Sequence, residues 1–173
     1  MSCNDIDVIP DTKNYSWEEL ISYCVDVYSQ LQTDGFVPEV IICVSRGGFF
    51  PGLVMSHLCK TQLLYSVRAS TNVDEKIRSE RKQPIIESLF TRENINVIQN
   101  KKILIIDDVF NTGLTIKAVY DYLKEIDNDL VIKTACMVFD TYSVAPDSDK
   151  HVVVDYYSDK RCAWAVFPWE TVL

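Results

Sequence analysis

Two adjacent carboxylates, Asp107 and Asp108, follow the apolar run "KKILII" and precede the turn "NTGLT". Like charges side by side at the end of a buried strand destabilise a fold unless a cation or a hydroxyl-bearing ligand binds them. Carboxylate oxygens accept hydrogen bonds from hydroxyl groups and coordinate Mg²⁺. The pair therefore predicts a ligand with a diol, a metal or both. The alternative is a pair of strand-end acids that only caps the next helix.

The turn "NTGLT" has the composition of a phosphate-binding turn. Gly113 frees the backbone, and successive N–H groups at a helix N-terminus attract an anion. The hydroxyls of Thr112 and Thr115 can add hydrogen bonds. The Walker A pattern GxxxxGK[ST] is absent, and many turns of this type bind nothing. Together with the acid pair, however, the turn fits a ribose 5-phosphate.

A second candidate anion site is "SRGG" at residues 45–48. Gly47 and Gly48 allow close approach of the backbone, and Arg46 carries a permanent positive charge. A second phosphate-like group is the expected ligand. The alternative is a glycine turn that serves only to connect a strand to a helix.

The elements that must position these residues alternate between strands and helices. The first helix is expected within residues 15–36, where Ser16 and Glu19 have the spacing of a capping box. Its expected apolar stripe consists of Leu20, Ile21, Cys24, Val25, Tyr28 and Leu31. Strands are expected at 39–45, 62–67, 102–107, 130–139 and 151–157, and further helices at 53–60 and from Thr115.

This alternation predicts one α/β domain over residues 1–173 with a mostly parallel sheet. Ligands of such sheets bind beyond the carboxyl ends of the strands, where the strand order reverses. The loops "SRGG", "DDVFNTGLT" and "FDTYS" are expected there. Residues 68–99 are polar and weakly patterned, which is typical of a functional lid or a disordered insert.

The composition limits the class of protein. The formal charge of -8 disfavours a general nucleic-acid binder. The six cysteines lack metal-site spacing, and several lie in apolar runs, which favours reduced, buried thiols. The N-terminus is polar, and no apolar run approaches the about 20 residues needed to cross a bilayer. We therefore expect a cytoplasmic protein without a membrane partner.

The run "ILIIDDVFNTGLT" resembles the 5-phosphoribosyl 1-diphosphate (PRPP) signature of the type I phosphoribosyltransferases. The similarity continues in "VSRGGFFPG" and in "CAWAVFPWE", so it covers about residues 39–170. The last motif is similar to the xanthine-guanine phosphoribosyltransferase group. The resemblance implies a Rossmann-like core of five strands, a mobile hood within about residues 68–99, and Mg²⁺ as cofactor.

The resemblance also assigns roles. It implies that Asp107 and Asp108 hold the ribose hydroxyls directly or through Mg²⁺, and that Trp164 stacks on a nucleobase whose edge the Val166 backbone contacts. For Trp164, the alternative is a core aromatic. Residues Arg78, Arg81 or Lys82 of the hood would lie near the leaving diphosphate. The implied PRPP site consists of Ser45, Arg46, Gly47, Asp107, Asp108, Asn111, Thr112, Gly113, Leu114 and Thr115.

Two positions depart from the 6-oxopurine enzymes of this family. Asn111 stands where they carry an Asp that receives a proton from the base, and asparagine cannot act as a general base. Asp140, or Thr141 if the alignment shifts by one residue, stands where they carry a Lys. A carboxylate there suits an exocyclic amine better than a carbonyl.

The sequence thus predicts a Mg²⁺-dependent glycosyltransferase of nucleotide salvage that moves phosphoribose from PRPP to a ring nitrogen of a base, most simply a purine. Members of the family tend to form dimers or tetramers, so the resemblance implies a homodimer or homotetramer. One alternative is transfer to an unusual amino-bearing base. Another is a PRPP- or nucleotide-binding regulatory module that has lost transfer. A receiver-like domain and a sugar-phosphate phosphatase fit less well, because each needs its acidic motif at an early strand, and the acid pair of this chain lies mid-chain.

Overall fold

The computed structural model describes residues 11–70, 85–88, 95–141 and 154–171. Their main sheet has six strands in the order β4-β3-β2-β5-β6-β7. The strands are β2 (Val40–Ser45), β3 (Leu63–Ser70), β4 (Ile85–Ser88), β5 (Lys102–Phe110), β6 (Val131–Asp140) and β7 (Tyr156–Arg161). All neighbours pair in parallel except β3 and β4. The predicted parallel α/β sheet with five core strands is therefore confirmed, with an antiparallel edge strand added.

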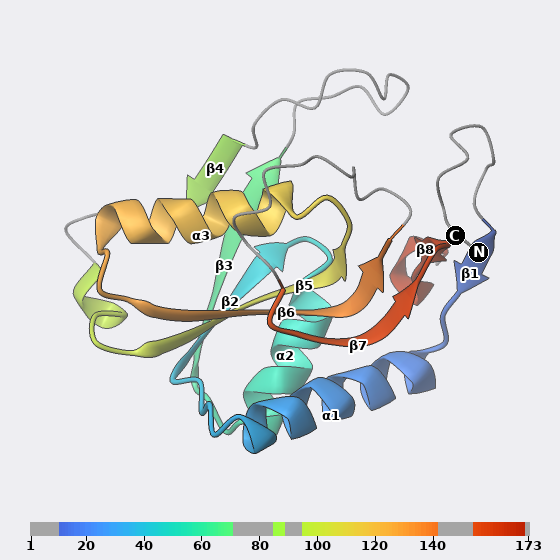
Figure 1. Cartoon of the computed structure of the whole chain (residues 1–173), viewed down its shortest axis with the longest axis horizontal. Helices are drawn as coiled ribbons and strands as arrows, with labels where there is room; N and C mark the ends of the chain where they lie inside the picture. Colours follow the sequence, from blue (N-terminus) through green and yellow to red (C-terminus); the bar gives the residue numbers. More distant parts are fainter. Residues whose placement is uncertain (1–10, 71–84, 89–94, 142–153, 172–173) are drawn as a thin grey trace.

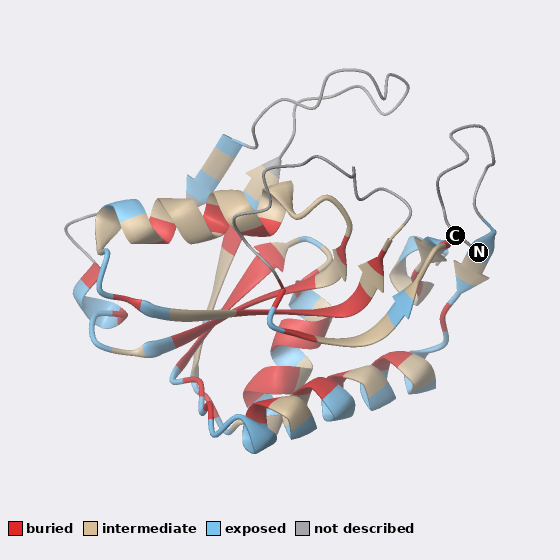
Figure 2. Ribbon diagram, in the orientation of Figure 1, coloured by how far each residue is buried: buried red, intermediate tan, exposed pale blue. Residues whose placement is uncertain are grey.

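The α-helices of the described residues cover the sheet on both faces (Figure 1). Helices α1 (Trp17–Thr33) and α2 (Phe49–Leu58) lie against one face, and α3 (Leu114–Ile126) lies against the other. Each face buries its own apolar core, as the continuous apolar strands require. Buried residues accordingly concentrate in the central strands and on the inner sides of the helices (Figure 2).

Helix α1 begins as predicted, but its buried stripe differs from the prediction. The Ser16 hydroxyl accepts the Glu19 N–H at 3.2 Å, and the Glu19 carboxylate accepts the Ser16 N–H at 2.8 Å. The predicted stripe was wrong at Ile21 and Val25, which are 49% and 46% exposed. The face that packs on the sheet is Leu20, Cys24, Val27 and Leu31. These spacings of four, three and four residues keep the side chains on one side of a helix.

Two predicted boundaries also move. Helix α2 begins at Phe49, before the predicted 53–60, because Pro51 is tolerated in the first turn of a helix, where its missing N–H has no partner to lose. Strand β7 begins at Tyr156, and residues 151–153 of the predicted strand lie outside the described residues. The prediction missed residues 158–161 of β7, because this part of the strand is polar.

A second, two-stranded sheet joins distant parts of the chain. Strand β1 (Thr12–Asn14) pairs in parallel with β8 (Trp164–Val166) beside the end of the main sheet (Figure 1). Short 3₁₀ helices, η1 (Ile95–Val97) and η2 (Pro168–Glu170), complete the described elements. The small sheet therefore fixes the segment that contains "WAVFPWE".

Only part of the predicted hood falls within the described residues. Strand β3 extends to Ser70, and β4 and η1 occupy 85–88 and 95–97. Residues 71–84 and 89–94 lie outside the described residues. Arg78, Arg81 and Lys82 are among them, so their predicted role near the diphosphate stays a prediction.

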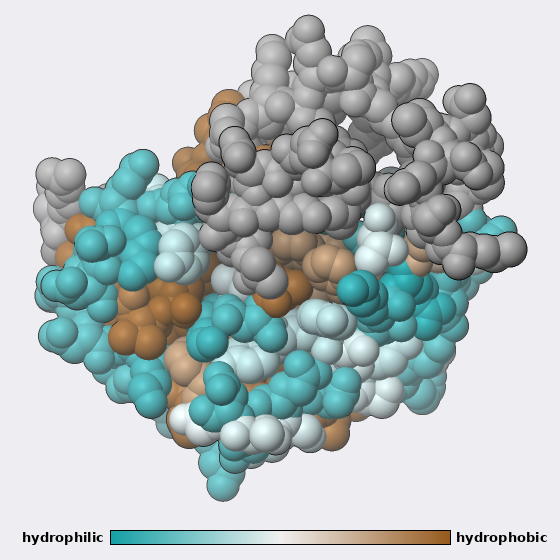
Figure 3. Space-filling view, in the orientation of Figure 1, coloured by the Kyte–Doolittle hydropathy of each residue, from teal (hydrophilic) through white to brown (hydrophobic). Residues whose placement is uncertain are grey.

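The cysteines and the surface agree with most expectations from composition. Cys24, Cys43 and Cys136 are buried free thiols, and Cys59 is a half-buried one. Burial raises the pKa of the Cys43 thiol to about 12, so it stays protonated. Cys162, in contrast, is disulfide-bonded, which corrects the expectation of reduced thiols for this residue. Hydrophilic residues cover much of the described surface in Figure 3, and none of the helices described is long and apolar enough to span a bilayer.

Candidate functional site

The acid pair lies near the carboxyl end of β5, which continues to Phe110 instead of ending at the predicted residue 107. Asp107 is only 9% exposed. Its Oδ1 atom accepts the Asp108 N–H at 2.9 Å, and the Asp108 Oδ1 atom accepts the Val109 N–H at 2.7 Å. None of the ion pairs among the described residues involves either carboxylate. The pair therefore has hydrogen bonds but no cation in this part of the protein.

Burial makes ionisation of the pair costly. Burial, and then the neighbouring charge of Asp108, hold the pKa of Asp107 well above its ordinary value. Burial raises the pKa of Asp108 to about 6, and the charge of Glu170 contributes to that rise. Two carboxyls with raised pKa values in one place are typical of a functional site. A cation or hydroxyl donors would relieve this cost.

The "SRGG" loop contacts the acid pair. It connects β2 to α2, and the peptide bond between Ser45 and Arg46 is cis. A Cβ atom added to Gly47 would lie 2.0 Å from Oδ2 of Asp108, so only glycine fits there. Strands β2 and β5 are neighbours at the point where the strand order reverses. The structure thus brings these two predicted loops together at the switch point of the sheet.

The "NTGLT" turn leads from β5 into α3. Gly113 adopts a left-handed conformation with φ of +77° at the N-cap, and a Cβ atom there would lie 2.6 Å from the Phe110 ring. The Thr112 hydroxyl accepts the Leu114 N–H at 3.4 Å. A pocket of about 160 Å³ lies here, lined by Asp107, Val109, Phe110, Asn111, Thr112, Gly113, Thr115 and Ile116. Asp107 of the acid pair and the predicted phosphate turn therefore meet at one small cavity.

Asn111 and Asp140 lie side by side at the ends of β5 and β6. The strands pair Phe110 with Phe139, so the next residue of each chain segment falls at the same sheet edge. The Asn111 Nδ2 group donates to Oδ2 of Asp140 at 3.2 Å, and Asp140 is 3% exposed. Oδ1 of Asn111 is buried and has no hydrogen-bond partner among the described residues. Sequence reasoning named both residues but did not foresee their contact.

The C-terminal segment contains the two residues predicted to bind the base, Trp164 and Val166. Trp164 is 51% exposed, so it is not a core aromatic. The Val166 carbonyl accepts the Tyr15 N–H at 3.0 Å, and the Tyr15 ring stacks on Phe167 with 5.5 Å between centroids. Strand β1 and the residue after it thus hold β8 in place. The influence of Glu170 on Asp108 was missed, because the two are 62 positions apart and no motif links them.

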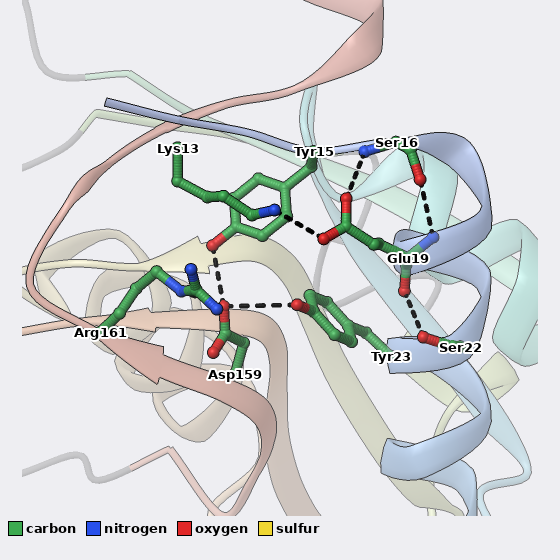
Figure 4. A network of polar contacts seen from close by, with 8 residues as sticks. All are labelled: Lys13, Tyr15, Ser16, Glu19, Ser22, Tyr23, Asp159 and Arg161. Atoms are coloured by element: carbon green, nitrogen blue, oxygen red, sulfur yellow. Dashed lines mark hydrogen bonds and ion pairs between the residues drawn. The ribbon is translucent and has the colours of Figure 1, made fainter. Parts of the chain in front are cut away.

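A polar network joins the segment around β1, which pairs with β8, to helix α1 and strand β7 (Figure 4). Asp159 of β7 accepts the Tyr15 hydroxyl at 2.9 Å and the Tyr23 hydroxyl at 3.5 Å, and it pairs with Arg161. Burial and the Asp159 charge raise the pKa of Tyr15, which therefore remains a neutral donor. Lys13 pairs with the Glu19 carboxylate at 2.6 Å. Strands β1 and β7 and helix α1 are joined here.

The site suits a phosphorylated sugar and a metal. Carboxylate oxygens are the ligands that Mg²⁺ prefers, and Mg²⁺ is usually held by one or two carboxylates together with substrate phosphates. The acid pair, which has no cationic partner in the part of the chain that the structure describes, fits this pattern. Within the described ranges, no group of three or more His, Cys, Asp or Glu side chains is placed to hold a metal ion. Arg46, exposed at the tip of its loop, adds positive charge nearby.

Comparisons with known proteins agree with this geometry. The sequence matches the phosphoribosyl transferase domain family over residues 16–173. No curated protein matches the chain. A Helicobacter pylori xanthine-guanine-hypoxanthine phosphoribosyltransferase is 22% identical, with a TM-score of 0.73 over 92% of this chain and 94% of that one.

Two further solved structures are similar. A purine phosphoribosyltransferase from Pyrococcus horikoshii Ot3 is 26% identical, with a TM-score of 0.72 over 94% of this chain and 96% of that one. A hypothetical protein from Neisseria gonorrhoeae with bound ppGpp is 14% identical, with a TM-score of 0.76 over 95% of this chain and 92% of that one. The Helicobacter and Neisseria likenesses, both below 25% identity, show a shared fold alone.

Proposed function

Because this chain belongs to the phosphoribosyl transferase domain family, we propose that it transfers the 5-phosphoribosyl group of PRPP to a ring nitrogen of a purine-like base in nucleotide salvage. Diphosphate is the leaving group. The observation that carries the proposal is the contact between the acid pair, the "SRGG" loop and the pocket of the "NTGLT" turn. This arrangement offers positions for a diol, a diphosphate and a 5-phosphate at one sheet edge.

The PRPP half of the site is assigned to two loops. Asn111, Thr112, Gly113, Leu114 and Thr115 would surround the 5-phosphate at the start of α3, where backbone N–H groups attract an anion. The other loop would bind the diphosphate through Ser45, Arg46 and Gly47. The left-handed Gly113 and the close contact at Gly47 support these roles, since both let the backbone approach a ligand.

Asp107 and Asp108 would hold the ribose hydroxyls and Mg²⁺. When bound, the metal would neutralise charge on the departing diphosphate. The carboxylates themselves orient the sugar, because each can accept a hydroxyl hydrogen bond. The burial of Asp107 would help to keep bulk water away from the anomeric carbon, which limits attack by water on the oxocarbenium-like transition state.

The base half is assigned to the platform on β8. The exposed Trp164 ring would stack on the base, and the Val166 backbone would contact its edge. Strand β8 lies against the carboxyl end of β6, where Asp140 is found. The base would thus be held across the cavity from the sugar, with its nitrogen facing the anomeric carbon.

Diphosphate release tests the proposal. Purified protein is incubated with PRPP, Mg²⁺ and, separately, guanine, xanthine, hypoxanthine, adenine, uracil, orotate and nicotinate. Turnover with a purine supports the proposal, and turnover with none of the seven contradicts transfer to a common base. In parallel, the double variant Asp107→Asn, Asp108→Asn should lose Mg²⁺-dependent PRPP binding while remaining folded. Asp129→Asn, at an exposed position, is the matched control for removal of an acid.

A second candidate is a PRPP- or nucleotide-binding regulatory module without transfer. Asn111 favours it, because an amide cannot take the proton that an acceptor base loses. The two candidates differ in one measurement: the module binds PRPP with Mg²⁺ by titration calorimetry but releases no diphosphate with any base.

We also propose that the protein works in the cytoplasm as a homodimer or homotetramer. The free thiols of Cys24, Cys43 and Cys136 are typical of a reducing compartment, and the implied family behaviour supports the assembly. Analytical ultracentrifugation measures the assembly directly, and a monomer at micromolar concentration would contradict it.

A further inference from the structure

Tyr15 contacts the segment around β8 in two ways and the main sheet in a third. Its backbone N–H donates to the Val166 carbonyl at 3.0 Å, and its ring stacks on Phe167 with 5.5 Å between centroids and 18° between planes. Its hydroxyl donates to Oδ2 of Asp159 at 2.9 Å. Tyr15 is 5% exposed, so these contacts are shielded from water. The residue lies outside positions 39–170, to which the family resemblance extends.

Strand β8 depends on such contacts because its sheet is small. It pairs with β1 over three residues, from Thr12 opposite Trp164 to Asn14 opposite Val166. A pair of short strands is marginally stable unless other elements pack against it. Tyr15 follows Asn14 directly, and its bond to the Val166 carbonyl ends this pairing. The position of Trp164 and of the Val166 backbone therefore depends on where Tyr15 is held.

Asp159 fixes Tyr15 to the main sheet. It belongs to β7, and its carboxylate accepts the hydroxyls of Tyr15 and Tyr23, at 2.9 Å and 3.5 Å (Figure 4). The carboxylate also pairs with Arg161, whose guanidinium lies 5.6 Å from the centroid of the Tyr15 ring. Hydrogen bonds to an ionised acceptor are about twice as strong as those between neutral groups. The Tyr15 ring is thus held at its hydroxyl by β7 and on its face by Phe167.

We propose that Tyr15 is a positioning residue for the acceptor base and that Asp159 holds it in place, so that β8 presents Trp164 and the Val166 backbone to the base. The inference rests on the proposed transfer reaction and extends its base half to the segment before α1. The assigned PRPP loops follow β2 and β5, and neither contains a residue of this network. Loss of the Tyr15 hydroxyl should therefore weaken base binding while PRPP binding stays unchanged.

Tyr15→Phe tests the inference, because it removes the hydroxyl and keeps the ring and the backbone. A hydrogen bond to a charged group corresponds to about tenfold or more in an equilibrium constant. Since β8 has other contacts, we expect part of this loss, a rise in KM for the base of about three- to tenfold. Tyr23→Phe removes the more distant hydroxyl and should raise KM less than about twofold. Tyr28→Phe, at a half-buried position of α1 outside the network, is the matched control and should behave as wild type.

Two further variants test Asp159. Asp159→Asn keeps an oxygen that can accept the Tyr15 hydroxyl, whereas Asp159→Ala removes the acceptor. KM for the base should therefore rise more in Asp159→Ala than in Asp159→Asn. The readouts are KM for each purine that wild type turns over, at saturating PRPP and Mg²⁺, and the PRPP Kd from titration calorimetry. Circular dichroism checks that each variant is folded at the assay temperature. A structural role alone would not separate the two ligands.

Each outcome bears on the inference. An unchanged KM for the base in Tyr15→Phe, or a PRPP Kd that rises by the same factor, overturns it and leaves the proposed function intact. Equal KM values in Tyr15→Phe and Tyr23→Phe also overturn it. If wild type binds PRPP and a purine but releases no diphosphate, the transfer reaction fails, and the same ratios are expected in the calorimetric Kd of the purine. If wild type binds no purine, the base half fails and the inference with it.

Discussion

Replacement of Asp108 by asparagine is expected to stabilise the ligand-free protein at neutral pH. Burial raises the pKa of this carboxyl from 3.8 to about 6, so the charged form is disfavoured in the folded state. The folded protein then binds more protons than the unfolded chain between these two values. Because of this difference, the free energy of unfolding of the wild type decreases as pH rises through the window, and the loss is complete above about pH 6.

The magnitude follows from the same numbers. One pKa unit corresponds to about 1.4 kcal/mol, so a rise from 3.8 to about 6 gives an upper value of about 3 kcal/mol. Asp108 is partly reached by solvent, which lowers the expected gain to about 1–3 kcal/mol. For a domain of this size that gain raises Tm by about 2–12 °C. Removal of the charge beside Asp107 acts in the same direction.

Urea unfolding followed by circular dichroism, without Mg²⁺, measures the effect at about pH 7.5 and about pH 4. The variant should be more stable than wild type at the higher pH, and the difference should shrink toward zero at the lower one, where the folded wild-type carboxyl is already neutral. Asp129→Asn should change little at either pH, because this carboxylate is exposed. A variant no more stable than wild type at about pH 7.5 would refute the reasoning that burial makes this charge costly.

Three further predictions concern ligands. Gly47→Ala should weaken PRPP binding at least about tenfold, because the added Cβ would lie 2.0 Å from Oδ2 of Asp108. Titration calorimetry measures this affinity. An unchanged affinity would show that the "SRGG" loop does not bind PRPP. Mg²⁺-dependent PRPP affinity should fall by up to about tenfold per pH unit below about pH 6, because protons then compete with the metal for Asp108. An affinity that does not change between about pH 5 and 7 would contradict metal binding at Asp108. Trp164→Ala should raise KM for the base about tenfold or more and leave the PRPP affinity unchanged. Trp164→Phe should retain most of the stacking. Equal KM values for Trp164→Ala and the wild type would show that the ring does not hold the base.

The sheet and the acid pair could be predicted because local pattern determines them. Continuous β-branched runs such as "VIICV" fit only strands covered on both faces, and two acids after "KILII" must lie at the carboxyl end of such a strand. The capping box at Ser16 and Glu19 is likewise local. These features depend on neighbours within a few residues, so the sequence contains them directly.

Other features depend on residues far apart in the chain. Helix α1 carries apolar residues on more than one side, and only its packing on the sheet shows that Val27 is buried while Ile21 and Val25 are exposed. The pairing of β1 with β8 joins two strands of three residues, too short for any periodic pattern. The hydrogen bond between Asn111 and Asp140 depends on the register of β5 on β6. No alternation or spacing in the sequence specifies that register.

The parallel pairing of β1 and β8 has a consequence for the order in which the protein assembles. The two strands come from opposite ends of the described chain, and closing so long a loop costs more entropy than joining neighbours along the sequence. The pairings of β2 with β3 and with β5, which position the "SRGG" and "NTGLT" loops, join residues that are closer together in the chain. We therefore expect the "SRGG" and "NTGLT" loops to form before β1 pairs with β8. The β1–β8 pairing should also be the first to open under mild denaturant.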